Sequence, residues 1–195
     1  MAAGNPPPFK IILGSKSVAR GNILADMGYQ FTVMTADIDE KEIRRENPEE
    51  LVIILAEAKA DAIISKLNVT DYKEKAAEPT LLITSDTVVV HQGIIREKPS
   101  SKEEAWEFLK GYSGGHVSTV GSVIVTNLKT GVRKGGWDKA EIREGVVFNA
   151  AGGLLLEHQL TLPFVESVVG AADSVMGLPK ALTEKLINEA LSSIS

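Results

Sequence analysis

The stretch LLITSDTVVVHQGIIREKP, residues 81–99, decides the fold of this chain. Its two apolar runs, at 81–83 and 88–90, are short and rich in β-branched residues, which predicts a buried strand rather than a helix. The Gln-Gly pair at 92–93 predicts a hairpin turn, after which the chain returns as a second strand. Pro99 ends that strand, because proline has no amide to donate to a neighbouring strand.

An acidic residue, Asp86, stands in the middle of this predicted strand. An unpaired buried carboxylate is costly, so Asp86 must reach a cleft, a cation or a metal, or else have a raised pKa. Pairing His91 with Ile94 in the hairpin would place Lys98 opposite Thr87, one diagonal step from Asp86. The pattern therefore predicts a candidate site with a carboxylate and a cation on one wall. The alternative is that Asp86 ends a strand and Lys98 is a solvated edge residue.

Composition bounds the class of protein. The 195 residues are enough for one compact domain, which we expect to span residues 1–195. The absence of cysteine excludes disulfides, zinc-thiolate sites and a cysteine nucleophile, and three scattered histidines disfavour a histidine-rich metal site. A net charge of -5 and a pI of about 5.3 argue against a nucleic-acid coat or an anionic-membrane binder.

The N-terminal segment, residues 1–8, consists of small residues and a run of prolines, which predicts a flexible leader rather than a signal peptide. No apolar run approaches the roughly 20 residues that a membrane span requires. We therefore expect a protein of the reducing cytoplasm.

A second candidate site follows the first predicted strand, residues 9–13. Residues 14–17 form a Gly/Ser turn, and Ser17 is placed to cap a helix predicted over residues 18–27. Free backbone amides and the helix dipole there favour an anion, so the pattern predicts a phosphate site. An ordinary serine cap after a first strand is the alternative. The side chains around this spot are Ser15, Ser17 and Arg20.

Three carboxylates crowd the segment after a second predicted strand, residues 29–34. Asp37, Asp39 and Glu40 lie beyond the end of that strand, where carboxylate oxygens are suitable ligands for a hard divalent cation. The alternative is a charged surface loop, which composition alone favours.

A long helix is predicted from Pro48 to about Leu67, with Asn47 as its N-cap and Glu50 positioned for a capping box. Lys59 lies close to the apolar stripe of this helix, so its ammonium is expected at the edge of a cleft. A lysine extended along the surface is the commoner alternative. The predicted stripe consists of Leu51, Ile54, Leu55, Ala58 and Ala62.

The remaining segments are predicted from turn residues and from the spacing of apolar residues. They are a loop at 68–79, a helix at about 101–110 capped by Ser101, a strand at 116–127, a turn at 128–131, a returning strand at 132–142, a strand or short helix at 163–169, a loop at 170–177, and a final helix that begins at Leu178-Pro179.

Eight short stretches, taken together, point to one family. They are LGSKS at 13–17 with Arg20, DIDE at 37–40, AKA at 58–60, SDTVV at 85–89, EKP at 97–99, LKGYSG at 109–114, WDKA at 137–140 and VMGLP at 175–179. No single stretch is decisive, but their ordered co-occurrence across nearly the whole chain is specific. In this order they resemble the Maf or septum-formation-inhibitor-like nucleotide pyrophosphatases.

The resemblance implies hydrolysis of a nucleoside triphosphate between the α and β phosphates, giving a monophosphate and pyrophosphate with Mg²⁺ or Mn²⁺ as cofactor. By motif, Asp86 is the base that activates water, and Glu40 together with Asp86 holds the metal. The substrate-binding residues carried over are Ser15, Ser17, Arg20, Lys59, Thr87 and Lys98. The implied fold is α/β, a long twisted mixed β-sheet with flanking helices and a deep cleft between two lobes, similar to inosine triphosphatases. A homodimer is expected in this family.

Three positions of the family pattern are linked to the choice of nucleobase, which are Ala19, Thr87 and Glu157, and this chain departs from the pattern at the first and the last of them. Thr87 is retained, but Ala19 replaces the arginine of the dTTP/UTP group and the tryptophan of the 7-methyl-GTP group. Glu157 aligns with a glutamine, and an ionised glutamate accepts hydrogen bonds without donating them. Residues 142–149 are shorter than the family's strand and helix there, and our hypothesis is that a helix flanking the cleft is missing.

Two other functions stay open from the sequence. One is a non-catalytic nucleotide-binding regulator of cell division, and the other is a house-cleaning triphosphatase acting on damaged or modified purines. A Rossmann dehydrogenase is disfavoured, because the first predicted strand is not followed by a G-x-G-x-x-G turn.

Overall fold

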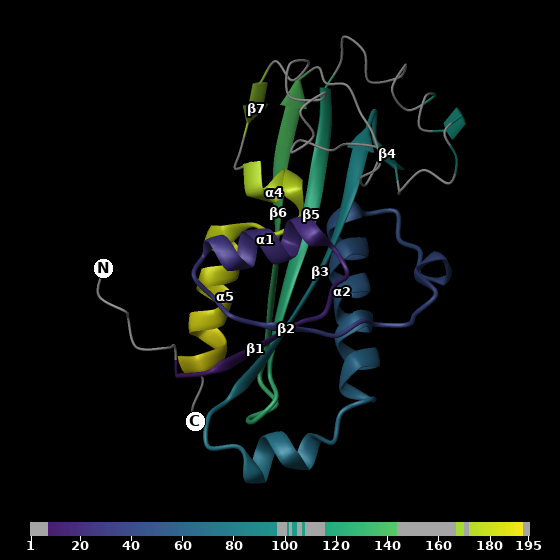
Figure 1. Cartoon of the computed structure of the whole chain (residues 1–195). Coiled ribbons are helices and arrows are strands. Elements are labelled where there is room, and N and C mark those ends of the chain that lie inside the picture. The colour runs from purple at the N-terminus through teal and green to yellow at the C-terminus, as the bar shows by residue number, and fades with distance from the viewer. Residues whose placement is uncertain are drawn as a thin grey trace.

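The computed structural model describes residues 8–96, 116–143, 167–169 and 172–192, together with 101, 103, 104 and 107. These residues form a mixed seven-stranded sheet with helices on both faces (Figure 1). The strands are β1 (Lys10–Leu13), β2 (Thr32–Val33), β3 (Thr80–His91), β4 (Ile94–Arg96), β5 (His116–Asn127), β6 (Arg133–Arg143) and β7 (Ser167–Val169). The helices are α1 (Val18–Asp26), η1 (Glu40–Glu42), α2 (Pro48–Ile64), η2 (Asp71–Lys75), α4 (Ala172–Met176) and α5 (Lys180–Ser192).

Strand β3 is the centre of the sheet, whose order is β2-β1-β3-β5-β6-β7. β1 runs parallel to the first part of β3, β5 runs antiparallel along its other edge, and β4 pairs with its last residues. The mixed sheet with flanking helices that the sequence predicted is confirmed. The cleft between two lobes and the single domain over residues 1–195 stay predictions.

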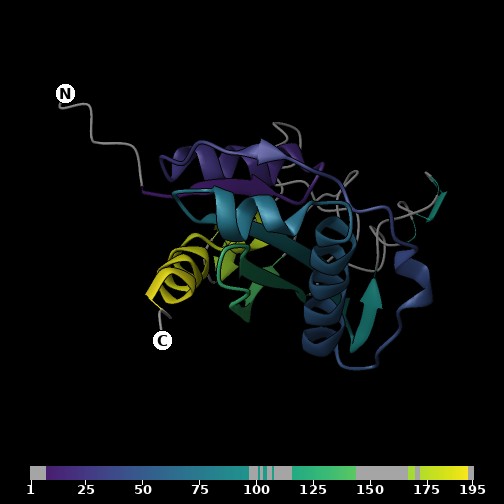
Figure 2. The same ribbon diagram turned by 90° about the horizontal axis from the view of Figure 1, so that it is seen from below.

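Alternation along β3 divides the core between the two faces of the sheet. Leu81 and Ile83 pack with α1 and α5 on one face, whereas Leu82 packs against α2 on the other. Val88 also packs on α2, with Leu51. Figure 2 shows the same arrangement from below, with α1 and α5 on one side of the strands and α2 on the other. Residues next to each other on β3 therefore face different helices.

The hairpin predicted at residues 92–93 is confirmed, and its register is the predicted one. His91 pairs with Ile94, and the strand of residues 116–127 has the predicted bounds. Gln92 and Gly93 both have positive φ angles, of 52° and 75°. This conformation is that of a type I′ turn, whose twist matches that of the strands it joins.

Four predicted elements differ from the structure. The strand expected at 29–34 is only Thr32–Val33, and the helix expected to reach Leu67 ends at Ile64. The loop expected at 68–79 contains η2, and the loop expected at 170–177 contains α4. A helix of five residues has too few positions to show a helical period, so the spacing of apolar residues did not reveal it.

The buried face of α2 also differs from the predicted stripe. Leu51 and Leu55 are buried as predicted. Ile54, Ala58 and Ala62, which were also predicted on the buried face, are only half-buried. α2 is apolar over most of its surface, so the spacing does not single out the side that packs on β3. The other buried residues are Val52, Ala56, Ala60 and Ile63.

Several predictions fall largely outside the described residues. They are the leader up to residue 7, most of the helix at 101–110, and the part of the shortened segment at 144–149. The predicted cap of the 101–110 helix agrees with the structure, because the Ser101 Oγ accepts the Glu104 backbone amide at 3.1 Å.

Candidate active site

The candidate site lies where the strand beside β3 changes. Along β3, the pairing with β1 ends at the pair Leu13–Ile83, and the pairing with β4 starts only at the pair Arg96–Val89. Between these points the described residues place no strand on this edge of β3, along residues 84–88. Points where neighbouring strands diverge are the usual ligand sites of open α/β sheets. The Ser-Asp-Thr motif of β3 occupies this position.

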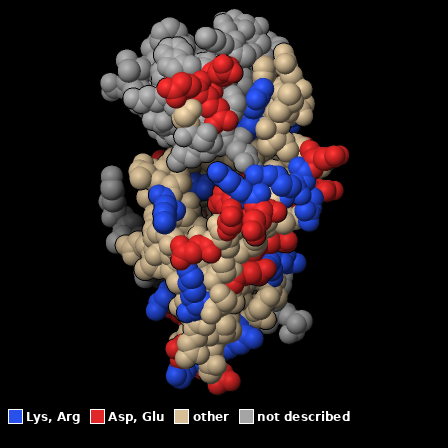
Figure 3. Space-filling view, turned by 90° about the vertical axis from the view of Figure 1, so that its right-hand side faces the viewer, with Lys and Arg blue, Asp and Glu red and all other residues tan. Residues whose placement is uncertain are grey.

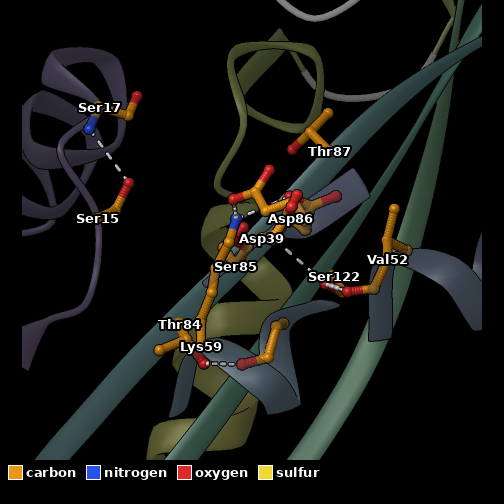
Figure 4. Close-up of polar contacts among 12 residues, drawn as sticks. Ser15, Ser17, Asp39, Val52, Lys59, Thr84, Ser85, Asp86, Thr87 and Ser122 are labelled. Atoms are coloured by element: carbon orange, nitrogen blue, oxygen red, sulfur yellow. Dashed lines mark hydrogen bonds and ion pairs between the residues drawn. The ribbon is translucent and has the colours of Figure 1, made fainter. Parts of the chain in front are cut away.

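Asp86 and Lys59 form the central pair of the site. Lys59 reaches from α2 to the Asp86 carboxylate on β3, with Nζ 2.8 Å from Oδ1 (Figure 4). The same ammonium lies 3.1 Å from Glu40 Oε1 and donates to the Ser85 carbonyl at 3.3 Å. The side chains of Lys59 and Asp86 are only 12% and 10% exposed, so water screens this pair weakly. One cation thus gathers two carboxylates from distant parts of the chain.

Buried hydroxyls fix α2 on β3 and so fix Lys59 relative to Asp86. The Thr84 Oγ1 donates to the Ala56 carbonyl of α2 at 2.8 Å. The Ser122 Oγ donates to the Val52 carbonyl at 2.6 Å and accepts the Asp86 backbone amide at 3.3 Å (Figure 4). Ser122 was not among the predicted site residues, because nothing in its local sequence shows that it bridges a helix and a strand.

Burial dominates the electrostatics of Asp86. Removal from water raises the pKa of this carboxyl, while the charges of Lys59 and Arg20 act to lower it and that of Glu40 raises it further. Burial also lowers the pKa of Arg20 from its ordinary value, against the attraction of the same two carboxylates. A buried acid whose pKa is raised beside cations is typical of a functional site.

The pH dependence of stability follows from this raised pKa. Below its ordinary pKa of 3.8, Asp86 stabilises the fold fully, and this contribution is lost as the pH rises through the pKa of the folded state. We expect the free energy of unfolding of the wild type, relative to Asp86→Asn, to fall as the pH rises across the acid range. Urea denaturation in EDTA at a series of pH values checks this. A difference that grows with pH would contradict it.

The turn before α1 has the predicted capping contacts. The Ser17 Oγ accepts the Arg20 backbone amide at 3.3 Å, and the Ser15 Oγ accepts the Ser17 amide at 3.1 Å (Figure 4). This confirms Ser17 as the N-cap of α1. The helix N-terminus, with its partial positive charge, therefore belongs to the site.

Arg20 joins three parts of the chain. Its Nη1 donates to the Ser15 Oγ at 3.3 Å, its Nη2 to the Thr87 Oγ1 at 3.1 Å, and its Nε to the Gly177 carbonyl at 2.8 Å. The structure thus brings together four of the predicted substrate-binding side chains, Ser15, Ser17, Arg20 and Thr87. Gly177 is a further residue of the site that the sequence analysis did not single out, although it lies in the VMGLP stretch.

Only one of the three acidic residues at 37–40 reaches the central pair. Glu40 contacts Lys59, whereas Asp37 pairs with Lys66 at 2.7 Å. The hydrogen bond from Lys66 and its charge lower the pKa of Asp37. The Asp39 Oδ1 accepts the Lys41 amide at 3.0 Å and so caps η1. The contacts of Asp37 and Asp39 agree with the charged surface loop, which was the alternative that composition favoured for this segment.

The remaining predicted residues are placed only in part. Ala19 is half-buried in the first turn of α1, next to Arg20. Lys98 and Glu157 lie outside the described residues, so their roles stay predictions.

The fold and site define an α/β protein in which a buried carboxylate, a lysine and an arginine lie where strand pairing changes, an arrangement suited to an anionic ligand. The chain belongs to the Maf-like protein family, whose family model matches residues 10–190. The resemblance given by the sequence motifs is thus confirmed.

Relatives of this chain carry the names of pyrophosphatases. A 7-methyl-GTP pyrophosphatase of Dictyostelium discoideum is 36% identical, over 92% of this chain and 96% of that protein. A dTTP/UTP pyrophosphatase of Bacteroides fragilis is 30% identical, over 88% and 91%. A nucleoside triphosphate pyrophosphatase of Streptomyces coelicolor is 28% identical, over 93% and 90%.

Among solved structures, that of a nucleoside-triphosphatase / dITP/XTP pyrophosphatase from Mycobacterium abscessus is similar. Its TM-score is 0.40 at 9% identity, and the match covers 94% of this chain and 95% of that one. A likeness at this level adds nothing to the strand pairing described above.

Proposed function

We propose that this chain is a nucleoside triphosphate pyrophosphatase with a house-cleaning role, which hydrolyses the bond between the α and β phosphates to give a nucleoside monophosphate and pyrophosphate. The observation that carries the proposal is the buried Asp86, held 2.8 Å from Lys59 in a chain of the Maf-like family. A site that only binds nucleotides has little need of a buried base beside two cations. The names of the relatives support the same reaction.

In the proposed reaction Asp86 acts as general base. Its carboxylate removes a proton from water, whose oxygen bonds to the α phosphorus while the bond to the α–β bridging oxygen breaks and pyrophosphate leaves. In this proposal Lys59 and Arg20 neutralise the phosphate oxygens, and the N-terminus of α1 adds backbone amides; their contacts at the site support this. Because these groups are held on helices and strands, they already point toward the charge that develops during the reaction, whereas water molecules would first have to reorient.

The cofactor we propose is Mg²⁺ or Mn²⁺, held by Glu40 and Asp86. The two carboxylates fit a hard cation, because oxygens of both lie within 3.1 Å of the same ammonium. Within the described residues no three acidic or histidine side chains form a metal cage, so phosphate oxygens and water must complete the coordination. When bound, such an ion neutralises charge on the departing pyrophosphate. Lys59 then remains available to the phosphates.

We propose that Ala19, Thr87 and Glu157 determine which nucleobase of the substrate this protein accepts. Thr87 already accepts a hydrogen bond from Arg20, which ties this position to the phosphate-binding residues. Since the relatives are named for 7-methyl-GTP and for dTTP/UTP, a methylated guanine and the pyrimidines are the first bases to test.

The test is pyrophosphate release from 7-methyl-GTP, dTTP, UTP, dITP, XTP and the common triphosphates, with Mg²⁺ or Mn²⁺. We expect release from one or a few of them, accompanied by an equal amount of monophosphate. Release of inorganic phosphate with a diphosphate product would show cleavage of another bond. Binding without hydrolysis of any triphosphate would favour a non-catalytic regulator, and preference for dITP or XTP would favour the purine house-cleaning function.

Other expectations about location and partners stay predictions. No helix in the described part of the chain is both long enough and apolar enough to cross a membrane. On the side of the molecule that carries α2, Lys and Arg side chains lie among Asp and Glu side chains (Figure 3). That face does not resemble the uniformly basic surface of a nucleic-acid coat. The cytoplasmic location is a proposal from the composition of the sequence, and the homodimer is a proposal from the family resemblance.

A further inference from the structure

We infer that Gly177, in the turn between α4 and α5, is a positioning residue for Arg20. This inference rests on the proposed function, because it concerns how the chain places a cation that binds the triphosphate. Gly177 does not itself contact the substrate in this account. It acts through its carbonyl, 157 residues away from Arg20 in the sequence.

The Gly177 carbonyl makes the shortest of the three hydrogen bonds to the Arg20 guanidinium. Its distance to Nε is 2.8 Å, against 3.1 Å from Nη2 to Thr87 and 3.3 Å from Nη1 to Ser15. The same carbonyl accepts the buried Ser85 hydroxyl at 3.0 Å. The three acceptors of Arg20 are uncharged oxygens, so these hydrogen bonds orient the guanidinium without pairing it directly with a carboxylate. Asp86 and Glu40 attract it only through their charge, so the oriented guanidinium can bind a phosphate group.

A side chain at residue 177 would strain the backbone and crowd Arg20. Gly177 has a φ of +111°, a conformation that residues with a Cβ rarely adopt. A Cβ there would lie 3.2 Å from the Arg20 Nε and 3.6 Å from its Cγ. Any larger residue would therefore both strain the turn and push directly on the guanidinium.

The turn itself is anchored on both sides. The backbone amides of Gly177 and Leu178 both donate to the Asp173 carbonyl at 3.1 Å, which ends α4. The Ser174 hydroxyl donates to the Asp138 carboxylate of β6 at 2.5 Å and so holds α4 on the sheet. Because α4 is fixed at both points, the Gly177 carbonyl is held in a set direction relative to Arg20. The hydrogen bond between Ser174 and Asp138 thus brings together the WDKA stretch, which contains Asp138, and the VMGLP stretch, which contains Gly177.

A double-mutant cycle tests the inference. Arg20→Ala is expected to lower kcat/KM for triphosphate by about 100-fold or more, and Gly177→Ala by about 10-fold. If Gly177 acts through Arg20, the double variant loses no more than Arg20→Ala alone. Losses that multiply in the double variant would overturn the inference. Gly131→Ala is the matched control, since Gly131 also has a positive φ, +79°, but nothing within 4 Å of its Cβ position.

A second readout needs no catalysis. In nucleotide-free and metal-free protein, the Arg20 Nε–H NMR signal, identified by its loss in Arg20→Ala, is expected to shift and to exchange faster with water in Gly177→Ala. Gly131→Ala should leave it unchanged. If Gly177→Ala does not fold, Ser174→Ala replaces it. We expect this variant to move the same signal away from its wild-type position, by less than is expected for Gly177→Ala. If the signal does not move in the folded variants, the inference about Gly177 is wrong, whether or not any triphosphate is hydrolysed. If the wild type hydrolyses no triphosphate, only the proposed function is wrong.

Discussion

Asp86→Asn is expected to lower kcat/KM for triphosphate hydrolysis by about 1,000-fold, the typical size of a lost general base. Asparagine keeps the shape of the side chain but cannot accept the proton of the attacking water. Lys59 keeps its contacts with Glu40 and with the Ser85 carbonyl, so the surrounding site should stay folded. Steady-state pyrophosphate release measures the loss, and titration with a non-hydrolysable α,β-methylene analogue measures binding, which we expect to change little.

The matched control is Asp71→Asn, which removes a carboxylate that pairs with Lys75 on exposed η2. Its hydrolysis should stay within about twofold of the wild type, because surface ion pairs contribute little. Full activity of Asp86→Asn would rule out Asp86 as the base. Loss of analogue binding together with activity would show that the main role of Asp86 is to hold the substrate or the metal, and would not support its role as the base.

Lys59→Met is expected to have the second largest effect, lowering kcat/KM by about 100-fold and destabilising the metal-free protein by about 3 kcal/mol. The substitution keeps the apolar stem in α2 but leaves the buried Asp86 without its ion-pair partner, next to Glu40. Since Lys59 acts to lower the pKa of Asp86, its removal should raise that pKa further. Urea denaturation and pyrophosphate release measure the two effects.

The response to a divalent cation distinguishes the two roles of Lys59. Without its ammonium, the two carboxylates are open to a metal, so Mn²⁺ added without nucleotide should stabilise Lys59→Met more than the wild type. Lys66→Met is the control, because Lys66 pairs with the exposed Asp37 rather than with Asp86. Equal stabilisation of Lys59→Met and wild type by Mn²⁺ would contradict a metal site formed by Glu40 and Asp86.

Much of the local structure could be predicted from neighbouring residues. The Gln92-Gly93 turn set the register of the hairpin, because few residues adopt two successive positive φ angles. Ser17 and Asn47 accept the expected backbone amides, since a cap needs only residues within three positions. The contact of Asp86 with a cation was also indicated locally, because a carboxylate within an apolar strand must find a partner.

The sequence by itself determined the family, the positions of most strands along the chain and the residue types of the candidate site. Only the tertiary structure decided which of these side chains meet. It selected Glu40 over Asp37 and Asp39 as the second carboxylate on Lys59, and it showed which face of α2 is buried. It also joined the Gly177 carbonyl to Arg20. Local spacing encodes turns, caps and periodicity, whereas contacts between distant segments arise only when helices pack on both faces of one sheet.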